Sequence, residues 1–435
     1  MHAKHPFFRR RSLAPLARER DRIRCVSRHP SAGGDGFDRR PSMASTVAAD
    51  GHRRYRALEK VGEGAFGTVL RGLDRETGAE VALKRVRVRD LRAVPVAALR
   101  EMNALRRLEH PHIVPLLGVH THGASLVLVM AYVPHSLGTV LAARDLPLPE
   151  AVAGVFARML LEGLCAIHAD GLLHRDIKPN NLLVAATGTL MIADFGQARL
   201  LPPRSEAASL SHAVATRWYR APELLLGARR YDGGVDMWAC GCVVAQMLSL
   251  SPLLPGDSDI DQIFQVVRLL GTPTEEAWPG LTALPDYAKI ELPAGVPPTP
   301  LALRLPLASD DAVALVQALL RYDPRARATA REALAVSWIV HSPARTPPLA
   351  ALLPGAPLAG ERAGAATPRE AGAPAAAAAS VTAPTFPSVL CARPTPFAAD
   401  EAGAASRTGV AHAVKLWQKM RAREAEEAPG ERDYC

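Results

Sequence analysis

Cysteine is scarce in this sequence, and its placement excludes several kinds of protein. The 435 residues include six cysteines without a regular spacing: Cys25, Cys165, Cys240, Cys242, Cys391 and Cys435. A disulfide framework is therefore excluded, and a reducing compartment is indicated. The one close pair, Cys240 and Cys242, lies in the apolar run MWACGCVVAQML, which predicts buried thiols on a helix in place of metal ligands. Cys435 is the last residue of the sequence, so it is not a prenylation site of the C-a-a-X kind.

Long apolar runs and a charge excess in the central part are also missing. No stretch of about 18 uninterrupted apolar residues occurs, so we predict no membrane span. The net charge is +9, but residues 1–54 carry 13 Lys and Arg against 5 Asp and Glu, whereas residues 55–341 carry 29 of each. Since the excess lies at the N-terminus, it does not indicate a nucleic-acid groove in the folded part, and we predict no nucleic-acid partner.

Both ends of the chain differ in composition from its centre. Residues 1–54 are rich in arginine, which is consistent with an organellar transit segment; we favour a disordered basic leader, or translation that begins at Met43. Residues 342–406 are rich in Ala, Pro and Gly and are predicted to form a linker. In the tail, 407–435, Trp417 and its apolar neighbours share one face of an amphipathic segment, which either docks on a partner or on the chain itself, or is a fraying helix.

The most informative stretch is residues 173–197, LHRDIKPNNLLVAATGTLMIADFGQ. It holds His174, Arg175 and Asp176 as HRD, then Lys178 and Asn181, and then DFG, which begins at Asp194. This spacing is typical of phosphoryl transfer from ATP, in which a carboxylate accepts the proton of the attacking hydroxyl and hard oxygen ligands hold Mg²⁺. We assign the proton acceptor to Asp176 and the Mg²⁺ ligands to Asn181 and Asp194, with Lys178 facing the transferred phosphate.

A glycine-rich segment near the start of the central part predicts a flap over nucleotide phosphates. The pattern is Gly62-x-Gly64-x-x-Gly67-x-Val69, between β-type runs at 55–61 and 68–73. The glycine spacing alone also suits a dinucleotide-binding fold, but there the loop opens a helix, whereas here it leads into a second strand. Glycine lets backbone N–H groups approach a phosphate without obstruction by a Cβ.

A lysine within an apolar strand needs an anionic partner. Lys84 lies in the strand predicted at 80–86, and the partner we nominate is Glu101, on a helix whose apolar residues recur every three positions. This lysine would bridge the α- and β-phosphates of ATP. Two further strands, 113–119 and 125–133, complete a five-stranded small lobe that ends near Met130. We predict that adenine hydrogen bonds to the Ala131 carbonyl and the Val133 amide.

The remaining motifs predict a mainly helical large lobe. Helices are expected at about 150–169, from Asp236 onwards, and at 259–270, 310–320 and 329–336. Residues 200–215 lack periodicity and are typical of an activation segment. Glu223 in APE is predicted to form a buried ion pair with Arg327 in YDPRARAT.

These motifs, in this order from residue 55 to about 341, resemble the eukaryotic protein kinases. WYRAPELLLGARRYDGGVDMWACGC and LLGTPTEEAWPGLTALPDYAKI are similar to the cyclin-dependent-kinase branch of the CMGC group, and LGTP, LPDYAKI and VATRWYRAPELL resemble its cell-cycle-related kinase subfamily. The resemblance implies an α+β bilobal fold, with a small lobe at 55–133 and a large lobe at 134–341. It also implies ATP and Mg²⁺ as cofactors and protein substrates phosphorylated at Ser or Thr before Pro. A cyclin or cyclin-like activator, a role in the cell cycle or in cilium or flagellum length, and a location in the cytoplasm, the nucleus or the cilium are further expectations.

The resemblance assigns further site residues. The nucleotide site would include Val61, Gly62, Gly64, Gly67, Val69, Ala82, Lys84, Met130, Ala131, Val133 and Leu183. Ser211 stands where an activating threonine is expected, and its phosphate would be received by Arg100, Arg175 and Arg199. The proline preference would come from Val214 and Ala215, whose backbone is turned so that Arg220 takes up a carbonyl.

Departures from the family pattern limit these expectations. PVAALRE replaces the PSTAIRE of the best-known members, so the kind of cyclin stays open. Ala65 and Phe66 replace the Thr-Tyr pair that inhibitory kinases phosphorylate, and Gln197 follows DFG in place of Leu. The alternatives to an active kinase are a pseudokinase scaffold and a small-molecule phosphotransferase, and an assay on a Ser-Pro peptide separates the first from a kinase. The second would lack the APE segment and its Arg327 partner.

Overall fold

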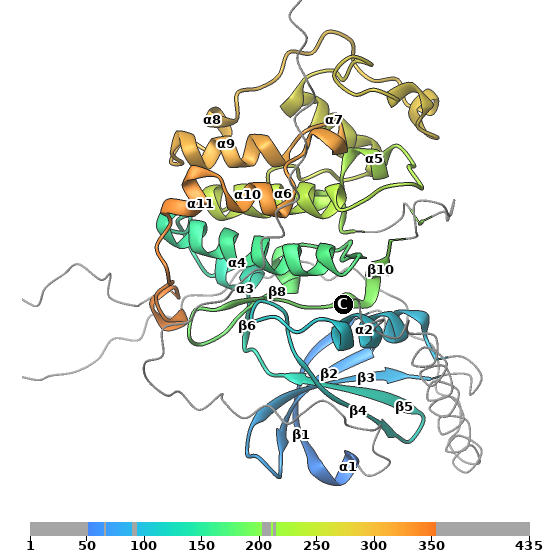
Figure 1. The fold of residues 1–435 in the computed structure, drawn as a ribbon, viewed down its shortest axis with the longest axis vertical. Coiled ribbons are helices and arrows are strands. Elements are labelled where there is room, and N and C mark those ends of the chain that lie inside the picture. The colour runs from blue at the N-terminus through green and yellow to red at the C-terminus, as the bar shows by residue number, and fades with distance from the viewer. Residues whose placement is uncertain (1–50, 65–66, 89–93, 202–209, 212–214, 354–435) are drawn as a thin grey trace, which may run out of the picture. The chain divides into compact units, whose positions relative to one another are not determined.

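The computed structural model describes residues 51–64, 67–88, 94–201, 210–211 and 215–353. The predictions for residues 1–50, for Ala65 and Phe66, for Val214 and for the tail beyond residue 353 lie outside these ranges. The described chain forms a small lobe built on one sheet and a large lobe built mainly of helices (Figure 1). This is the α+β bilobal fold expected from the motifs.

The small lobe is a five-stranded antiparallel sheet with the strand order β1-β2-β3-β5-β4. Its strands are β1 (Tyr55–Gly64), β2 (Gly67–Asp74), β3 (Glu80–Arg87), β4 (Leu116–His122) and β5 (Ser125–Ala131), and α1 (Gly51–Arg54) precedes them. Helix α2 (Val96–Arg107) crosses between β3 and β4, with Ala98, Met102 and Leu105 buried. Of the apolar positions predicted for this helix, Met102 and Leu105 are buried in it, Leu99 is only half-buried, and Leu108 is buried but follows the end of the helix.

The fourth strand begins later than predicted. We expected it at 113–119, but β4 spans Leu116–His122. Ile113 forms an isolated parallel bridge with Ile192 of the large lobe, and the Val114 amide donates to the Ile192 carbonyl at 3.0 Å. These peptide groups are engaged by a partner far away in the sequence, so the first residues of the apolar run join the lobes instead of the sheet.

The large lobe is arranged around α4 (Glu150–Ala169) and α6 (Gly234–Ser249). The other helices of four or more residues in the described ranges are α3 (Leu137–Ala142), α5 (Pro222–Leu225), α7 (Asp259–Leu270), α8 (Leu301–Arg304), α9 (Asp310–Leu319), α10 (Ala330–Leu334) and α11 (Ser337–His341). Ser258, Ser309 and Thr329 cap α7, α9 and α10 by accepting backbone N–H groups. These caps explain why three of these helices start within one residue of their predicted positions.

Helix α4 is long and apolar enough to cross a membrane by length and composition alone. In this fold it lies inside the large lobe, where Phe156, Leu161 and Leu164 are fully buried. The core helix of a folded domain has the same composition, so α4 gives little support for a membrane span.

Short strands and 3₁₀ turns line the large lobe where it meets the small lobe. A three-stranded sheet has the order β6-β8-β9, from β6 (His135–Ser136), β8 (Leu182–Val184) and β9 (Leu190–Ile192), and β7 (Leu172–Leu173) pairs with β10 (Arg199–Leu200). Short 3₁₀ turns complete the lobe: η1 (Pro179–Asn181), η2 (Phe195–Gln197), η3 (Arg217–Tyr219), η4 (Leu281–Ala283), η5 (Tyr287–Lys289), η6 (Pro324–Ala326) and η7 (Leu349–Ala351). The motif residues sit on η1, on η2 and beside the ends of β7 and β9.

The two thiols of the Cys240-Gly-Cys242 pair are buried on α6. Burial raises the pKa of Cys240 strongly and raises the pKa of Cys242 to about 12. Both thiols are thus protonated at neutral pH, as expected for residues of the core, and neither is suited to bind a metal.

Packing against the large lobe continues past His341, where we predicted that the lobe ends. Leu349, the first residue of η7, is 4% exposed, and Leu352, which follows η7, is 2% exposed. Residues 342–353, which we call the strap, run from α11 past one end of α4 toward the turn between β8 and β9 (Figure 1).

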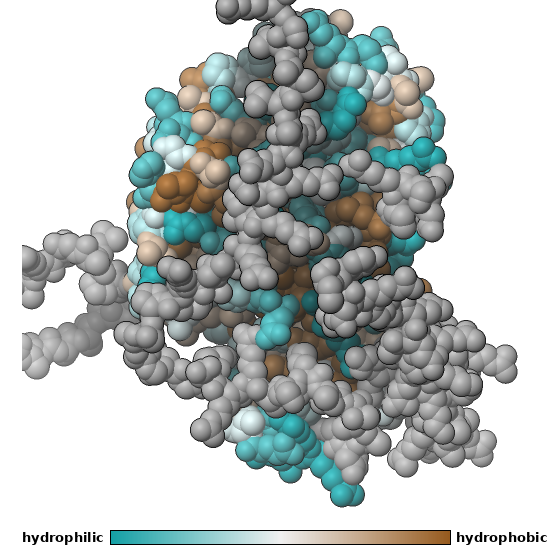
Figure 2. Space-filling model, in the orientation of Figure 1, coloured by the Kyte–Doolittle hydropathy of each residue, from teal (hydrophilic) through white to brown (hydrophobic). Residues whose placement is uncertain are grey.

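The visible surface is most hydrophilic at the outer end of the small lobe, over α1 and β1 (Figure 2). Charged residues such as Arg53, Arg56, Glu59 and Lys60 lie there. Over the large lobe the same view shows hydrophilic and hydrophobic residues intermixed.

Candidate active site

The glycine segment joins β1 and β2 directly, as expected for a flap. Gly64 pairs with Gly67 at the end of the hairpin, and Gly62 pairs with Val69; Val61, on β1, is 44% exposed. A Cβ added at Gly67 would lie 2.0 Å from the Arg85 carbonyl oxygen on β3. Glycine is therefore required at this position because the flap hairpin packs directly on the neighbouring backbone.

One face of the small-lobe sheet carries the predicted nucleotide residues. Val69 pairs with Lys84, and Ala82 pairs with Met130. Because directly opposed residues and alternate residues of a strand share a face, these four side chains lie on the same side of the sheet. β5 ends at Ala131, and Val133 belongs to the crossing to the large lobe, where Leu183 lies on β8.

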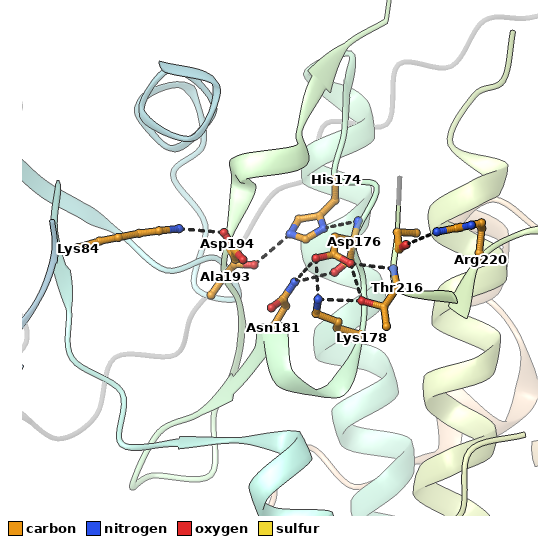
Figure 3. Close-up of polar contacts among 10 residues, drawn as sticks. Lys84, His174, Asp176, Lys178, Asn181, Ala193, Asp194, Thr216 and Arg220 are labelled. Carbon is orange, nitrogen blue, oxygen red and sulfur yellow. Dashed lines mark hydrogen bonds and ion pairs between the residues drawn. The ribbon is translucent and has the colours of Figure 1, made fainter. Parts of the chain in front are cut away.

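Lys84 joins the two lobes through two carboxylates. Its Nζ lies 2.7 Å from Glu101 Oε2 on α2 and 2.9 Å from Asp194 Oδ1 in the large lobe. Figure 3 shows the lysine extended from the sheet toward Asp194. The partner nominated from sequence is thus in contact, and the same ammonium group reaches the first residue of DFG.

Burial and the neighbouring charges shift the pKa values of Lys84, Glu101 and Asp194 in different directions. Burial lowers the pKa of Lys84, but the Glu101 and Asp194 carboxylates outweigh it and hold that pKa above the ordinary value of 10.5. Burial raises the pKa of Glu101, whose side chain is 3% exposed, and Lys84 only partly offsets this. The Asp194 side chain is 44% exposed; burial raises its pKa, but Lys84 outweighs burial and lowers it. Asp194 therefore remains ionised, as a cation ligand must be.

The Asp176 carboxylate is held by four hydrogen bonds. Lys178 Nζ and Asn181 Nδ2 donate to Oδ2 at 2.8 and 3.0 Å, and the amide and hydroxyl of Thr216 donate to Oδ1, each at 3.1 Å (Figure 3). Lys178 Nζ also donates to Thr216 Oγ1 at 2.8 Å. The carboxylate is thus fixed in orientation between the catalytic loop and the end of the activation segment.

Asn181 and Asp194 are brought together by the main chain. The Ala193 amide, next to Asp194, donates to the Asn181 carbonyl at 2.8 Å. Both amide hydrogens of Asn181 Nδ2 are used by Asp176, at its backbone oxygen and at Oδ2. Asn181 Oδ1 is therefore the atom of this side chain that is left to bind a cation.

These residues fit a Mg²⁺ ion that shares its ligands with a nucleotide. The described ranges contain no group of three His, Cys, Asp or Glu side chains that could hold a metal by themselves. Mg²⁺ is commonly bound by one or two protein oxygens together with water and substrate phosphates. Asn181 Oδ1 and the ionised Asp194 carboxylate match that donor set.

A buried aspartate on α6 supports the catalytic loop from behind. The amides of His174 and Arg175 donate to Asp236 at 2.9 and 2.7 Å, and His168 Nε2 lies 3.0 Å from the same carboxylate. Arg175 has φ of 67°, a left-handed conformation that is unfavourable for a residue other than glycine. The two N–H bonds to Asp236 hold the loop in this conformation.

The DFG segment is anchored to the same loop. His174 Nε2 lies 3.0 Å from the Ala193 carbonyl, and the Phe195 ring is fully buried with its centroid 4.8 Å from that of His174. Asp194 itself has φ of 63°. Contact between the two motifs thus sets the direction in which Asp194 points.

Arg100, Arg175 and Arg199 act on one another electrostatically, and Tyr231 links Arg175 to Ser211. Burial first, and then the charges of Arg199 and Arg175, lower the pKa of Arg100. Tyr231 Oη accepts from Arg175 Nη1 at 2.8 Å and donates to the Ser211 carbonyl at 2.5 Å. Ser211 is exposed. Arginines grouped in this way are suited to receive a phosphate.

The end of the activation segment has the turned backbone expected from sequence. Ala215 has φ of 65°, and Arg220 Nη2 donates to its carbonyl at 3.1 Å (Figure 3). Arg220 Nη1 is bound to Asp259 Oδ2 at 2.9 Å. The carbonyl of Ala215 is therefore occupied by the protein itself.

Glu223 and Arg327 form the buried ion pair predicted from sequence. The guanidinium donates to both carboxylate oxygens, at 2.6 and 2.7 Å, and neither side chain is more than 3% exposed. Arg327 also donates to the carbonyls of Arg321, Tyr322 and Gly234, so its remaining N–H groups are satisfied.

Three residues of this site were not predicted to act in it. Thr216 bonds both Asp176 and Lys178, Asp236 holds the catalytic loop, and Tyr231 links Arg175 to Ser211. In the sequence Asp236 attracted notice only as the start of a helix. An aspartate within the apolar run VDMWACGC is costly to bury unless it is bonded, and this was the available signal.

Comparisons with known proteins agree on one family. A family model described as the protein kinase domain matches residues 55–339. Cyclin-dependent kinase 20 of Danio rerio is 46% identical over 283 residues, which cover 65% of this chain and 82% of that protein. Cyclin-dependent kinase 7 of Xenopus laevis is 42% identical over 299 residues, covering 68% and 84%. A chain in the solved structure of the CAK complex from Chaetomium thermophilum bound to ATP-gamma-S is 35% identical, with a TM-score of 0.63, and the match covers 68% of this chain and 94% of that one.

Proposed function

The chain belongs to the protein kinase family, in the cyclin-dependent-kinase-like branch of the CMGC group, and from this premise we propose that it is catalytically active and transfers the γ-phosphate of ATP to Ser or Thr residues that precede Pro. The observation that carries the proposal is the Asp176 carboxylate, fixed by Lys178, Asn181 and Thr216. A scaffold without activity would not need this arrangement.

Asp176 accepts the proton of the substrate hydroxyl as the hydroxyl oxygen attacks the γ-phosphorus. Lys178, which already bonds Asp176 Oδ2, faces the group in transfer and stabilises its negative charge. Lys84 holds the α- and β-phosphates while Glu101 fixes its position. When bound, Mg²⁺ neutralises charge on the phosphate oxygens, and Asn181 and Asp194 are the residues that would hold it.

The preference for proline follows from the occupied carbonyl of Ala215. In an extended substrate the N–H of the residue after the phosphorylated one needs an acceptor, because an unpaired N–H removed from water is costly. Arg220 already uses the carbonyl of Ala215, and proline has no N–H. A substrate with proline at this position therefore has no N–H that would be left without a hydrogen-bond acceptor on binding.

The test of activity is an assay on a Ser-Pro peptide with the wild-type chain and Asp176→Asn. We expect the substitution to lower kcat by at least about 100-fold, because the proton acceptor is lost, whereas the affinity for ATP changes little. Undiminished phosphorylation by Asp176→Asn, or none by the wild-type chain with its activator present, would contradict the proposal.

The test of specificity compares Arg220→Gln with Arg217→Gln. Both arginines bond Asp259, but only Arg220 reaches the Ala215 carbonyl. We expect the ratio of kcat/KM for Ser-Pro over Ser-Ala peptides to fall by roughly 10-fold in Arg220→Gln, the equivalent of one hydrogen bond, and to stay unchanged in Arg217→Gln. Equal ratios in both variants would refute the role of the Ala215 carbonyl.

The biological setting that we propose rests on the resemblance of the sequence to the cyclin-dependent kinases. A cyclin or cyclin-like activator would bind at α2, because that helix carries Glu101 and its residue Val96 is 59% exposed. We also propose a role in the cell cycle or in cilium or flagellum length, and a location in the cytoplasm, nucleus or cilium, on the resemblance of the sequence motifs to the cell-cycle-related kinase subfamily. Purification of the full chain from cells, followed by mass spectrometry of the bound proteins, tests whether a cyclin accompanies it.

A further inference from the structure

The strap, residues 342–353, is attached to the large lobe mainly through backbone atoms. Arg158 on α4 donates to the carbonyls of Ile339, Ser342 and Pro343, at 2.8, 2.6 and 3.0 Å. Farther along, the Leu349 amide donates to the Ala186 carbonyl at 3.0 Å, and Arg144 Nη1 donates to the Leu352 carbonyl at 2.6 Å. The strap thereby covers the turn between β8 and β9, the two strands that lie between Asn181 and Asp194.

A Thr-Pro sequence lies where the strap approaches the backbone of this turn closely. Thr346 Oγ1 donates to the Gly188 carbonyl at 2.7 Å, and Pro347 follows it. A Cβ added at Gly188 would lie 2.3 Å from Thr346 Oγ1 and 2.4 Å from the Pro347 carbonyl oxygen. The hydroxyl therefore sits against the backbone of the turn, with no space for a larger group.

We propose that Thr346 is a phosphorylation site for a second copy of this kinase, and that its phosphorylation detaches the strap from the β8–β9 turn. The inference rests on the proposed preference for proline. In the reaction a bond forms between Thr346 Oγ1 and the γ-phosphorus of ATP, and the bond from that phosphorus to the β,γ-bridging oxygen breaks. ADP leaves, and the hydroxyl proton passes to Asp176 of the acting copy.

The strap cannot stay attached in its observed position once Thr346 is phosphorylated, for two reasons. A phosphothreonine has lost its hydroxyl hydrogen, so its acceptor oxygens would face the acceptor carbonyl of Gly188. The phosphoryl group also needs volume where a single Cβ would already overlap. Strap release is therefore coupled to the charge and size of the modification.

Release from one end distinguishes Thr346 from other Ser-Pro and Thr-Pro sites in the described ranges. Three of these other sites, Ser251, Thr272 and Thr299, lie outside the strap. The fourth, Ser342, lies at the attached end of the strap next to α11, where its hydroxyl donates to the Trp338 carbonyl at 2.6 Å. Thr299 also donates its hydroxyl to a carbonyl, that of Arg268, but it lies between α7 and α8 and is held by folded elements on both sides. Within residues 342–353 the strap holds only the short turn η7, so it can detach without the unfolding of α11 or another helix of the large lobe.

The experiment uses the full chain with MgATP and maps phosphorylation by mass spectrometry, with an Asp176→Asn chain uniformly labelled with ¹⁵N as a substrate whose peptides differ in mass from those of the wild-type kinase. We expect phosphate on Thr346 of the Asp176→Asn chain only when wild-type kinase is added, at a yield at least tenfold above that on Thr299. A Ser-Pro peptide serves as the internal control. Phosphorylation of the peptide without Thr346 would overturn this inference and leave the proposed function intact. Phosphorylation of neither would overturn both.

Hydrogen exchange then tests detachment. We expect the Leu349 amide, which bonds Ala186, to exchange at least tenfold faster in the phosphorylated chain than before the reaction. Thr346→Val keeps the shape but lacks the hydroxyl; it should retain peptide kinase activity and show no change in exchange when MgATP is added. Unchanged exchange at Leu349 with Thr346 phosphorylated, or equal yields at Thr346 and Thr299, would overturn the proposed detachment.

Discussion

Asp236 is the residue on which the geometry of the catalytic loop most depends. Its carboxylate is 1% exposed and accepts two consecutive backbone amides together with His168. Burial raises the pKa of Asp236, but these hydrogen bonds and the nearby histidines outweigh it and hold the pKa below the ordinary value of 3.8. The ionised form is therefore the one that the fold stabilises.

This direction of shift predicts how stability depends on pH. A carboxylate whose pKa is lower in the folded chain contributes stability that is present above pH 3.8 and is lost as the pH falls toward the folded pKa. We expect Asp236→Asn to lower the free energy of unfolding at pH 7, and the difference from wild type to narrow below pH 3.8. Urea unfolding of both chains from pH 7 to below pH 3.8 measures this difference in the free energy of unfolding. A difference that widens in acid would contradict a lowered pKa of Asp236.

At the scale of elements, the Glu223–Arg327 pair joins α5, at the end of the activation segment, to the region that precedes α10. The bidentate geometry and the extra bonds of Arg327 to three carbonyls leave no charge unsatisfied. Removal of one partner leaves a buried charge without compensation, which is more costly than the loss of an exposed pair.

We expect Glu223→Ala to lower the free energy of unfolding by about 3–5 kcal/mol. The matched control is Glu63→Ala, which breaks the exposed pair with Lys60 and should leave stability nearly unchanged. Chemical denaturation measures both. If Glu223→Ala lowers the free energy of unfolding no more than the control does, the buried pair does not stabilise the large lobe.

The elements that were predicted best from the sequence are those whose signals, such as capping residues and apolar periodicity, lie within the element itself. Helix α4 has the predicted bounds because Pro149 precedes it and its apolar face repeats over 20 residues. The predicted start of β4 was wrong because Ile113 forms a β-bridge with Ile192. No local periodicity in the sequence reveals a partner that far away. Helix α3 was not predicted, although Ser136 and Thr139 form a capping box at its start.

At the scale of the whole molecule, the least predictable part was the strap. Its Ala- and Pro-rich composition indicates a linker, and its attachment depends on Arg144, Arg158 and backbone carbonyls that lie far away in the sequence. The catalytic residues, in contrast, are grouped in short motifs whose chemistry is specific. Their supports, Thr216 and Asp236, come from other elements and became evident only once the chain was folded.

The strap also predicts where the chain can be shortened. A chain that ends at Leu353 keeps the burial of Leu349 and Leu352 that the full chain has, whereas one that ends at His341 loses it. At about 1.5–3 kcal/mol for each buried leucine, we expect a loss of up to about 3–6 kcal/mol. Thermal unfolding of the three chains tests this, and equal midpoints for the two shortened chains would contradict it.

Arg175 belongs to two parts of the molecule at once. Its main chain is fixed by Asp236, its guanidinium is bound to Tyr231 and the Gln197 carbonyl, and Asp176 is the next residue. A negative charge placed near that guanidinium therefore acts one peptide bond away from the proton acceptor. We therefore expect that a charge at this point can change the reaction rate without a rotation of one lobe against the other. Two forms of the chain that differ in turnover would then have nearly the same outline.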